Sequence, residues 1–336
     1  MAAAIAVVGA TGLVGEALLE QLAETGLSAD AVVPLASKES AGKRLEFGSG
    51  WLRVQDVDAF DFSGVQLALL AMPPREALAL TPKIADAGCI AVDLSGVWLA
   101  DPSAPVALPG VLEPDLDAVR ERNLVALPGA AASLAARFLA PLLDVLQPVS
   151  VDLTVLYPAA LAGRAGVEEL ASQSARLLGS QQPDAGLFPG RLAFSLVATG
   201  RAALGHGPLA VDASTELALA RLFPARHLLV GSQSVVLPQF FGLAVGMVVH
   251  GQGQLDSREA RAMLAAAGLE AEAEEEASVG ANLLEGLEPV SLRVTGLRCS
   301  GGDGTRLQAW LSADLVRGCA ARNGVQIVEL LLKDYS

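Results

Sequence analysis

The sequence predicts an α/β protein in which a doubly wound parallel sheet is followed by a second, α+β domain. Three observations lead to this prediction. Short apolar runs alternate with amphipathic helical stretches over the first third of the chain, three glycines join the first apolar run to the first helix, and longer strand-like runs begin after residue 146. Such alternation is typical of parallel strands connected by helices.

Five apolar runs are expected to form the parallel sheet. They are Ile5–Gly9, Ala31–Ala36, Val65–Ala71, Cys89–Asp93 and Leu124–Leu127. Helices are expected between them, including Glu16–Thr25 and Arg75–Ala87. Leu18, Leu19 and Leu22 lie on one face of the first of these helices, as packing on a sheet requires.

The expected second domain begins with a helix at Ala131–Leu146 and mixes long strands with helices. The strands are Val151–Tyr157, His227–Pro238, Ala244–His250, Ser291–Arg298 and Arg306–Leu311, and the helices are Gly166–Leu178, Thr215–Leu222 and Ser257–Ala267. A final helix, Asp314 to about Leu332, is expected to return and pack on the first domain. The acidic run Glu270–Glu276 is interpreted as a solvated edge strand or loop. We therefore expect residues 1–130 plus 314–336 to form one domain and residues 131–313 the other.

Composition and charge exclude several classes of protein. The 336 residues carry a formal charge of -14, which argues against nucleic acid and anionic membrane as partners. Cys89, Cys299 and Cys319 lack C-x-x-C spacing, so neither disulfides nor a metal site are expected, and a cytoplasmic location fits. The first residues lack the basic region of a signal peptide. The uncharged stretch His227–Leu255 has polar interruptions, so we interpret it as buried strand and not as a membrane span.

A nucleotide-binding turn is predicted at Gly9, Gly12 and Gly15. These glycines, within Gly-Ala-Thr11-Gly-Leu13-Val14-Gly, follow the first apolar run and lead directly into the first helix. Glycines let a backbone turn tightly and approach a pyrophosphate, whose charge is stabilised by the N–H groups and dipole at the helix start. This is the arrangement of a Rossmann dinucleotide site. Because the spacing is G-x-x-G-x-x-G, a tight turn without a ligand is the alternative.

The chain resembles the aspartate-semialdehyde dehydrogenase family in five segments that follow the family's order. They are Gly-Ala-Thr-Gly-Leu-Val-Gly (9–15), Ala-Ser-Lys-Glu-Ser-Ala-Gly-Lys (36–43), Gly-Cys-Ile-Ala-Val-Asp-Leu-Ser (88–95), Ala-Gly-Arg-Ala-Gly-Val-Glu-Glu-Leu (162–170) and Gly-Cys-Ala-Ala-Arg-Asn-Gly-Val-Gln-Ile-Val-Glu-Leu (318–330). Members of this family reduce an aspartyl phosphate to the semialdehyde with NADPH in amino-acid biosynthesis. A cysteine forms a thioester, a histidine handles the proton, and arginines hold the anionic groups. The resemblance also implies a homodimer formed through the second domain.

The resemblance identifies candidate cofactor-binding residues besides the glycine turn. Ser37, Lys38 and Ser40 are expected at the adenosine 2′-phosphate, and Asn323 is expected near the nicotinamide. NADP is therefore the expected cofactor. NAD is the alternative, because Glu39 stands where the family has an arginine and a carboxylate repels a phosphate. A plain solvated loop is the other interpretation of this segment.

The family's catalytic residues are missing when its motifs are carried over position by position. Ala130 stands at the cysteine of P-N-C-S-T, and Val236 and Leu243 stand at the arginine and histidine of R-V-P-V-x-x-G-H. Tyr157 replaces the glutamine of Q-A-V-S-G, and Leu99 replaces a second arginine. Shifting the alignment does not restore the chemistry, since no cysteine lies between positions 89 and 299 and no histidine between 227 and 250.

Other residues are weak substitutes for a nucleophile or acid. We interpret Ser133 as a helix cap, Cys89 and Cys319 as small buried thiols, and His206 as a loop residue. Tyr157 is interpreted as a core or interface residue, although it is also a candidate proton donor.

We therefore expect a catalytically degenerate, Usg-type paralogue of the family. It would be an NADP-binding homodimer that has little or no dehydrogenase activity and serves as a binding or regulatory protein. The alternative is an active NAD(P)-dependent oxidoreductase, with either the family's activity or direct hydride transfer to an uncharged substrate. The replaced arginines discriminate between these forms, because a phosphorylated, carboxylated substrate needs cations that Leu99 and Val236 do not provide.

Overall fold

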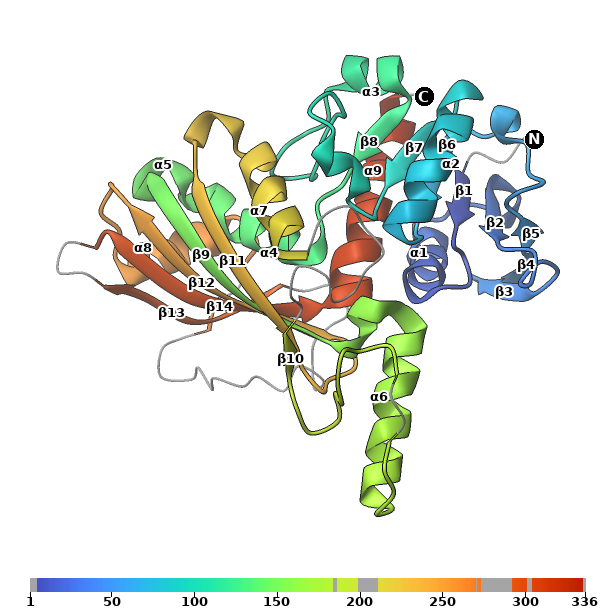
Figure 1. Ribbon diagram of the computed structural model, residues 1–336. Helices are drawn as coiled ribbons and strands as arrows, with labels where there is room; N and C mark the ends of the chain where they lie inside the picture. Colours follow the sequence, from blue (N-terminus) through green and yellow to red (C-terminus); the bar gives the residue numbers. More distant parts are fainter. Residues whose placement is uncertain are drawn as a thin grey trace. The chain divides into compact units, whose positions relative to one another are not determined.

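The computed structural model describes residues 5–183, 186–198, 211–269, 271–272, 292–300 and 304–334. The chain divides into two compact units, both drawn in Figure 1. The first comprises the described residues up to Gly129 and those from Ala320 onward, and the second comprises those from Ala130 to Cys319. Each unit is built on a six-stranded sheet. His206 lies outside the described residues.

The sheet of the first unit is parallel. Its strands are β1 (Ile5–Val8), β2 (Val32–Ala36), β5 (Gln55–Asp56), β6 (Leu67–Leu70), β7 (Ile90–Asp93) and β8 (Leu124–Ala126), in the order β5-β2-β1-β6-β7-β8. The helices described in this unit are α1 (Leu13–Glu24), α2 (Pro74–Asp86), α3 (Leu116–Arg122) and α9 (Arg322–Asp334). Every residue of β1, β2, β6, β7 and β8 is buried, because helices cover both faces of such a sheet. The doubly wound parallel sheet is thus confirmed, whereas the hairpin of β3 (Arg44–Phe47) and β4 (Gly50–Arg53) is not among the elements expected from the sequence.

Two glycines are sterically required where β1 passes into α1. Gly9 has a φ of +80°, and a Cβ atom there would lie 2.2 Å from the carbonyl oxygen of Ala71, which follows β6. A Cβ atom on Gly15 would lie 2.2 Å from the carbonyl oxygen of Gly9. Both distances are far shorter than a van der Waals contact. Only glycine therefore lets the turn lie this close to α1 and to the end of β6.

The second unit contains a mixed sheet. Its strands are β9 (Pro148–Tyr157), β10 (Val197–Ala198), β11 (Leu229–Val236), β12 (Gly242–Gly251), β13 (Arg293–Ser300) and β14 (Arg306–Asp314), in the order β10-β11-β9-β12-β14-β13. Only the β11–β9 pair among these is parallel. The helices described here are α4 (Ala130–Leu139), α5 (Leu143–Leu146), α6 (Gly163–Leu178), α7 (Val211–Leu222) and α8 (Ser257–Ala266). Helices α4 and α7 pack on one face of the sheet, which agrees with the predicted α+β character.

The structure of the second unit differs from the sequence expectation in one helix and describes only part of the acidic run. The single helix expected at Ala131–Leu146 is wrong, because α4 ends at Leu139 and a 3₁₀ turn containing Pro141 separates it from α5. Proline cannot donate the backbone hydrogen bond that would continue the helix. Most of the acidic run at residues 270–276 lies outside the described residues, but the amide of Glu272 donates to the carbonyl of Val294 in β13.

The uncharged stretch at residues 227–255 forms β11 and β12, as interpreted from its polar interruptions. No helix in the described ranges is long and apolar enough to cross a membrane.

The chain returns to the first unit through α9. A Cβ atom on Gly324 of this helix would lie 2.9 Å from a methyl carbon of Leu18 in α1 and 3.4 Å from one of Leu69 in β6. The absence of that atom lets α9 pack closely on α1 and on the end of the parallel sheet. The final helix that the sequence predicts therefore belongs with the first unit, in agreement with the expectation.

We predict that Gly9→Ala destabilises the protein more than Gly26→Ala. Gly26 has nearly the same backbone conformation, with a φ of +84°, but a Cβ atom there would meet no other atom within 4 Å. Gly26→Ala should therefore cost only the conformational strain, about 1–2 kcal/mol. Gly9→Ala should cost a further ~1–3 kcal/mol through the clash with Ala71. Urea unfolding followed by circular dichroism measures both, and equal losses would contradict the steric role of Gly9.

Candidate functional site

The glycine turn lies where the strand order of the parallel sheet changes direction. From β1 the chain continues to β2 on one side, and later to β6 on the other. Ligands of such sheets bind outside the carboxyl ends of the strands at this point. The amides of Gly9 and Ala10 donate to the carbonyl of Leu35 at 2.9 and 3.0 Å, and the amide of Ala71 donates to Val8 at 2.9 Å. These bonds tie the ends of β1, β2 and β6 around the turn.

The start of α1 has the geometry of an anion site. Gly12 is the N-cap residue, its conformation is extended, and no side chain caps the helix. Its amide donates to the carbonyl of Gly9 at 2.9 Å, which closes the turn. The first amides of a helix have no partner within the helix, and their dipoles favour a negative charge. The predicted residues Leu13 and Val14 thus lie in the first turn of α1, where backbone N–H groups have no partner within the helix.

The predicted adenosine-side residues form one tight turn directly after β2. The amide of Ser40 donates to the carbonyl of Ser37 at 2.9 Å, so Lys38 and Glu39 occupy the tip of the turn. Ser37, Lys38 and Glu39 are exposed. The side chain of Lys43 donates to the hydroxyl of Ser40 at 3.3 Å.

Asn323 lies in α9 and belongs to the same unit as the glycine turn. It is buried, and its neighbour Gly324 packs against Leu18, Leu69 and Leu94. Leu69 lies near the carboxyl end of β6, and Leu94 follows β7. The structure therefore brings Asn323 to the strand ends at which the glycine turn also lies.

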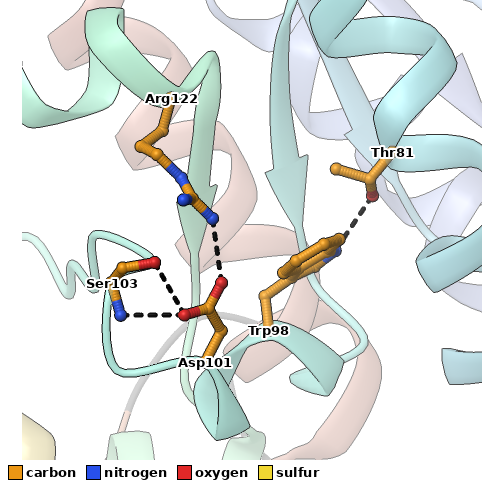
Figure 2. Close-up of polar contacts among 5 residues, drawn as sticks. All are labelled: Thr81, Trp98, Asp101, Ser103 and Arg122. Atoms are coloured by element: carbon orange, nitrogen blue, oxygen red, sulfur yellow. Dashed lines mark hydrogen bonds and ion pairs between the residues drawn. The ribbon is translucent and has the colours of Figure 1, made fainter.

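The loop that contains Leu99 is fixed by the buried carboxylate of Asp93. This carboxylate accepts hydrogen bonds from the amide and hydroxyl of Ser95, at 2.8 and 2.5 Å, and from the amide of Trp98 at 3.2 Å. Burial raises the pKa of Asp93, and these hydrogen bonds oppose the rise. The indole nitrogen of Trp98 donates to Thr81 of α2 at 3.0 Å, as Figure 2 shows. Leu99 is 1% exposed and is thus part of the core at this position.

An arginine does approach this loop, although it is distant in sequence. The guanidinium of Arg122, at the end of α3, lies 2.8 Å from the carboxylate of Asp101 (Figure 2). Asp101 also accepts bonds from the hydroxyl and amide of Ser103, which together with Arg122 lower its pKa. The charge of Arg122 is therefore already paired. Arg120, which is nearest to Leu99 in sequence, pairs with Asp117 at 3.6 Å.

In the second unit, the residues at the family's substrate and base positions meet at one end of the sheet. Tyr157 at the end of β9 is the register partner of Val236 at the end of β11. Leu243 precedes Ala244 in β12, and Ala244 is the register partner of Leu156. Tyr157, Val236 and Leu243 are 4%, 1% and 0% exposed. This end of the sheet is therefore a buried, largely apolar cluster.

Ala130 is the first residue of α4, and this helix packs on β12 and β14. The interpretation of Ser133 as the cap of this helix is wrong, because Ser133 lies inside α4 and is buried.

The hydroxyl of Tyr157 lies against α7, where it shares a hydrogen bond with the side chain of Thr215. Burial raises the pKa of Tyr157 well above its usual value, and the nearby Asp212 adds to the rise. Asp212 in turn accepts a hydrogen bond from Ser234 of β11 at 2.6 Å. Tyr157 is therefore a neutral core residue with a polar tip, as interpreted from the sequence. Its polar partners come from a distant helix, so the sequence around Tyr157 gives no signal for them.

The three cysteines do not form a reactive centre. Cys89 lies in the core of the first unit, and burial raises its pKa to about 12. Cys319 is buried in the π-helical turn at Leu315–Ala321, and Cys299 in β13 is half-buried with a raised pKa, mainly through burial. Among the described residues, no group of three or more histidine, cysteine or acidic side chains is placed to hold a metal ion.

Known proteins resemble both units of the chain. Residues 4–119 match the family model described as "Semialdehyde dehydrogenase, NAD binding domain". With 98% of both chains aligned, the protein is 34% identical to the USG-1 protein homolog of Pseudomonas aeruginosa and 29% identical to aspartate-semialdehyde dehydrogenase 2 of Vibrio cholerae. The crystal structure of aspartate semialdehyde dehydrogenase II of Vibrio cholerae with ASA covers the full length of both chains, with a TM-score of 0.90 at 28% identity.

We predict that no thiol of the folded protein reacts with iodoacetamide at the rate of an activated cysteine. At pH 8 a thiol with a pKa of about 12 is almost entirely protonated, and only the thiolate is nucleophilic. Peptide mapping after timed labelling should find slow modification of Cys299 and protection of Cys89 and Cys319, with all three labelled in urea. Rapid labelling of Cys89 or Cys319 in the folded protein would contradict the assignment of both as core residues.

Proposed function

We propose that this chain, which belongs to the aspartate-semialdehyde dehydrogenase family, is a Usg-type dinucleotide-binding homodimer with little or no dehydrogenase activity. One observation carries the proposal: the glycine turn is sterically intact, whereas apolar residues stand at the aligned catalytic positions, with Leu99, Val236 and Leu243 buried and Ala130 half-buried. Such a protein would serve as a binding or regulatory member of a biosynthetic family.

The proposed loss of activity rests on what the family's chemistry requires. An acyl intermediate needs a thiol nucleophile, and Ala130 offers none. The proton needs a base, and Leu243 is an aliphatic side chain that is fully buried. A phosphorylated, carboxylated substrate needs cations, and Val236 and Leu99 are core residues. In another enzyme class, removal of the nucleophile or the base alone lowers turnover by about a millionfold.

The proposed dinucleotide site uses only residues of the first unit. A bound nicotinamide dinucleotide would supply or accept a hydride. Gly9 and Gly15 would keep the turn tight against Ala71 and the start of α1, and the first amides of α1, after Gly12, would hold the charge of the pyrophosphate. The turn after β2, with Ser37, Lys38 and Ser40, would contact the adenosine end, and Asn323 would contact the nicotinamide end. The alternative of direct hydride transfer with Tyr157 as acid gains no support, because that hydroxyl is buried against Thr215.

We predict that the protein binds a nicotinamide dinucleotide but does not turn over aspartate semialdehyde. Calorimetry should detect binding, and an NAD(P)-linked assay with aspartate semialdehyde and phosphate should stay far below the ~10 s⁻¹ of a typical enzyme. Gly12→Ala keeps an allowed backbone conformation but places a methyl group in the phosphate cradle, so binding should weaken roughly tenfold. Gly190→Ala, where a Cβ atom meets no atom within 4 Å, is the matched control.

The turnover assay and the binding measurement test separate parts of the proposal. Turnover at an ordinary enzymatic rate would contradict the loss of activity. Failure of the unmodified protein to bind NAD or NADP would contradict the dinucleotide site.

A homodimer through the second unit is supported by an accessible face of its sheet. Opposite α4 and α7, a groove of about 800 Å³ runs across five strands. At its centre the indole of Trp310 lies over Gly246, where a Cβ atom would be 2.9 Å from the ring, and beside it stands Val248. Asp152 on β9 and Arg298 on β13 flank this centre on opposite sides. A two-fold arrangement of two such faces pairs opposite charges around an apolar centre.

Exposed apolar side chains also concentrate on the second unit. Among the described residues, six of the eight exposed large hydrophobic side chains belong to it, namely Val149, Leu178, Leu187, Phe194, Leu196 and Leu229. Exposed large apolar side chains are candidates for contact with another chain, and these six lie outside the lining of the groove.

We predict that Val248→Lys converts the dimer to a monomer. The lysine would stand opposite Asp152 in the sheet, so the folded monomer tolerates it, whereas burial of its charge in an interface is unfavourable. Leu78→Lys, at an exposed apolar position on α2 of the first unit, is the matched control. Light scattering at micromolar concentration should give a dimer for the unmodified protein and for Leu78→Lys. A monomeric unmodified protein would contradict the proposal.

A further inference from the structure

The tip of the turn after β2 stands beside the site proposed for the pyrophosphate. Leu35, the penultimate residue of β2, accepts hydrogen bonds from the amides of Gly9 and Ala10. The chain then leaves β2 at Ala36 and turns at Ser37–Ser40. In a doubly wound sheet, the adenosine ribose of a dinucleotide lies next to the pyrophosphate and over the end of the second strand. The turn is therefore placed to contact the group at the 2′ position of that ribose.

Glu39 holds an ionised carboxylate at this tip. The hydroxyl of Ser37 and the amide of Glu39 itself donate to the carboxylate, and these bonds lower its pKa below the ordinary value. The turn is closed by the amides of Ser40 and Ala41, which donate to the carbonyl of Ser37 at 2.9 and 3.2 Å. Glu39 is thus a negative charge at the tip, 24 residues after Gly15, near the spacing at which an acidic residue binds ribose hydroxyls.

The cation at the tip itself is Lys38, and three further cations, Lys43, Arg44 and Arg53, lie on the segment and hairpin that follow. Lys38 neighbours Glu39, so the two charges at the tip cancel. Lys43 donates to the hydroxyl of Ser40, on the far side of the turn. Arg44 and Arg53 face each other as register partners in the hairpin of β3 and β4. At the tip a 2′-phosphate would therefore meet the Glu39 carboxylate as well as the Lys38 ammonium, whereas a ribose 2′-hydroxyl would find an acceptor in Glu39.

We propose that Glu39 makes this chain select NAD over NADP, with the Glu39 carboxylate accepting a hydrogen bond from the adenosine ribose. The inference rests on the proposed dinucleotide site and favours NAD, the alternative named above, over the NADP expected from the family resemblance. The preference between NAD and NADP would then depend on one side chain, Glu39, and on the group at the 2′ position of the adenosine ribose.

Calorimetric titration of the full-length protein with NAD and with NADP tests this inference. We expect NAD to bind at least about tenfold more tightly than NADP. Glu39→Arg should reverse the preference, because it replaces an acceptor with a phosphate-binding cation. Glu39→Gln, which removes only the charge, should reduce the preference without reversing it. Glu121→Arg makes the same charge change on an exposed position of α3, which packs beside β8 at the far edge of the sheet, and should leave the ratio unchanged.

The NAD-to-NADP affinity ratios of the unmodified protein and of the Glu39 variants test separate parts of the inference. An unmodified protein that binds NADP as tightly as NAD, or more tightly, overturns the selectivity while the proposed dinucleotide site stands. A ratio that does not move in Glu39→Gln or Glu39→Arg overturns the role of Glu39. If neither dinucleotide binds the unmodified protein, the proposed function fails and the inference fails with it. Circular dichroism melting of each variant verifies that it is folded.

Discussion

The close approach of backbone to backbone at Gly9 and Gly15 is the constraint on which the first unit depends. Without a Cβ atom at either position, the turn lies against the carbonyl of Ala71 and folds back on itself at the start of α1. The position of α1 in turn sets that of α9, since Gly324 packs on Leu18. A steric requirement in seven residues therefore fixes the end of β1, the axis of α1 and the location of Asn323. The same bare backbone is the surface that an anion can approach.

In the second unit, the residues that the family resemblance aligns with substrate-binding and base positions form part of the core. Tyr157, Val236 and Leu243 are buried at adjacent strand ends, where they contribute to a continuous core. Burial of an aliphatic side chain of this size contributes about 1.5–3 kcal/mol, whereas a buried arginine or histidine needs partners to offset its desolvation. Apolar residues at these positions thus favour stability at the expense of reactivity. This is the direction expected where a site is released from catalysis.

On the proposed function, the dinucleotide site lies wholly in the first unit, whereas most of the replaced catalytic positions lie in the second. The glycine turn, the turn after β2 and α9 belong to the first unit, whereas Ala130, Val236 and Leu243 belong to the second. On the proposed function, occupancy of the first unit follows the dinucleotide concentration alone, and binding to the native state adds to its stability. On this proposal, the protein would respond to the dinucleotide concentration without oxidising or reducing the dinucleotide.

The sequence by itself determined the parallel sheet and the glycine turn, and it is the basis of the proposal that the family's catalytic side chains are replaced. These features are local, because burial on both faces gives β1, β6 and β7 continuous apolar runs and because a glycine turn needs only seven residues. The position of Pro141 also carried the signal for the break after α4, although the expected helix ran through it. Only the tertiary structure decided which distant residues meet: Val236 beside Tyr157, Thr215 at the Tyr157 hydroxyl, and Arg122 at Asp101. Strand register and helix docking create these contacts, and neither is encoded in the spacing of residues along one segment.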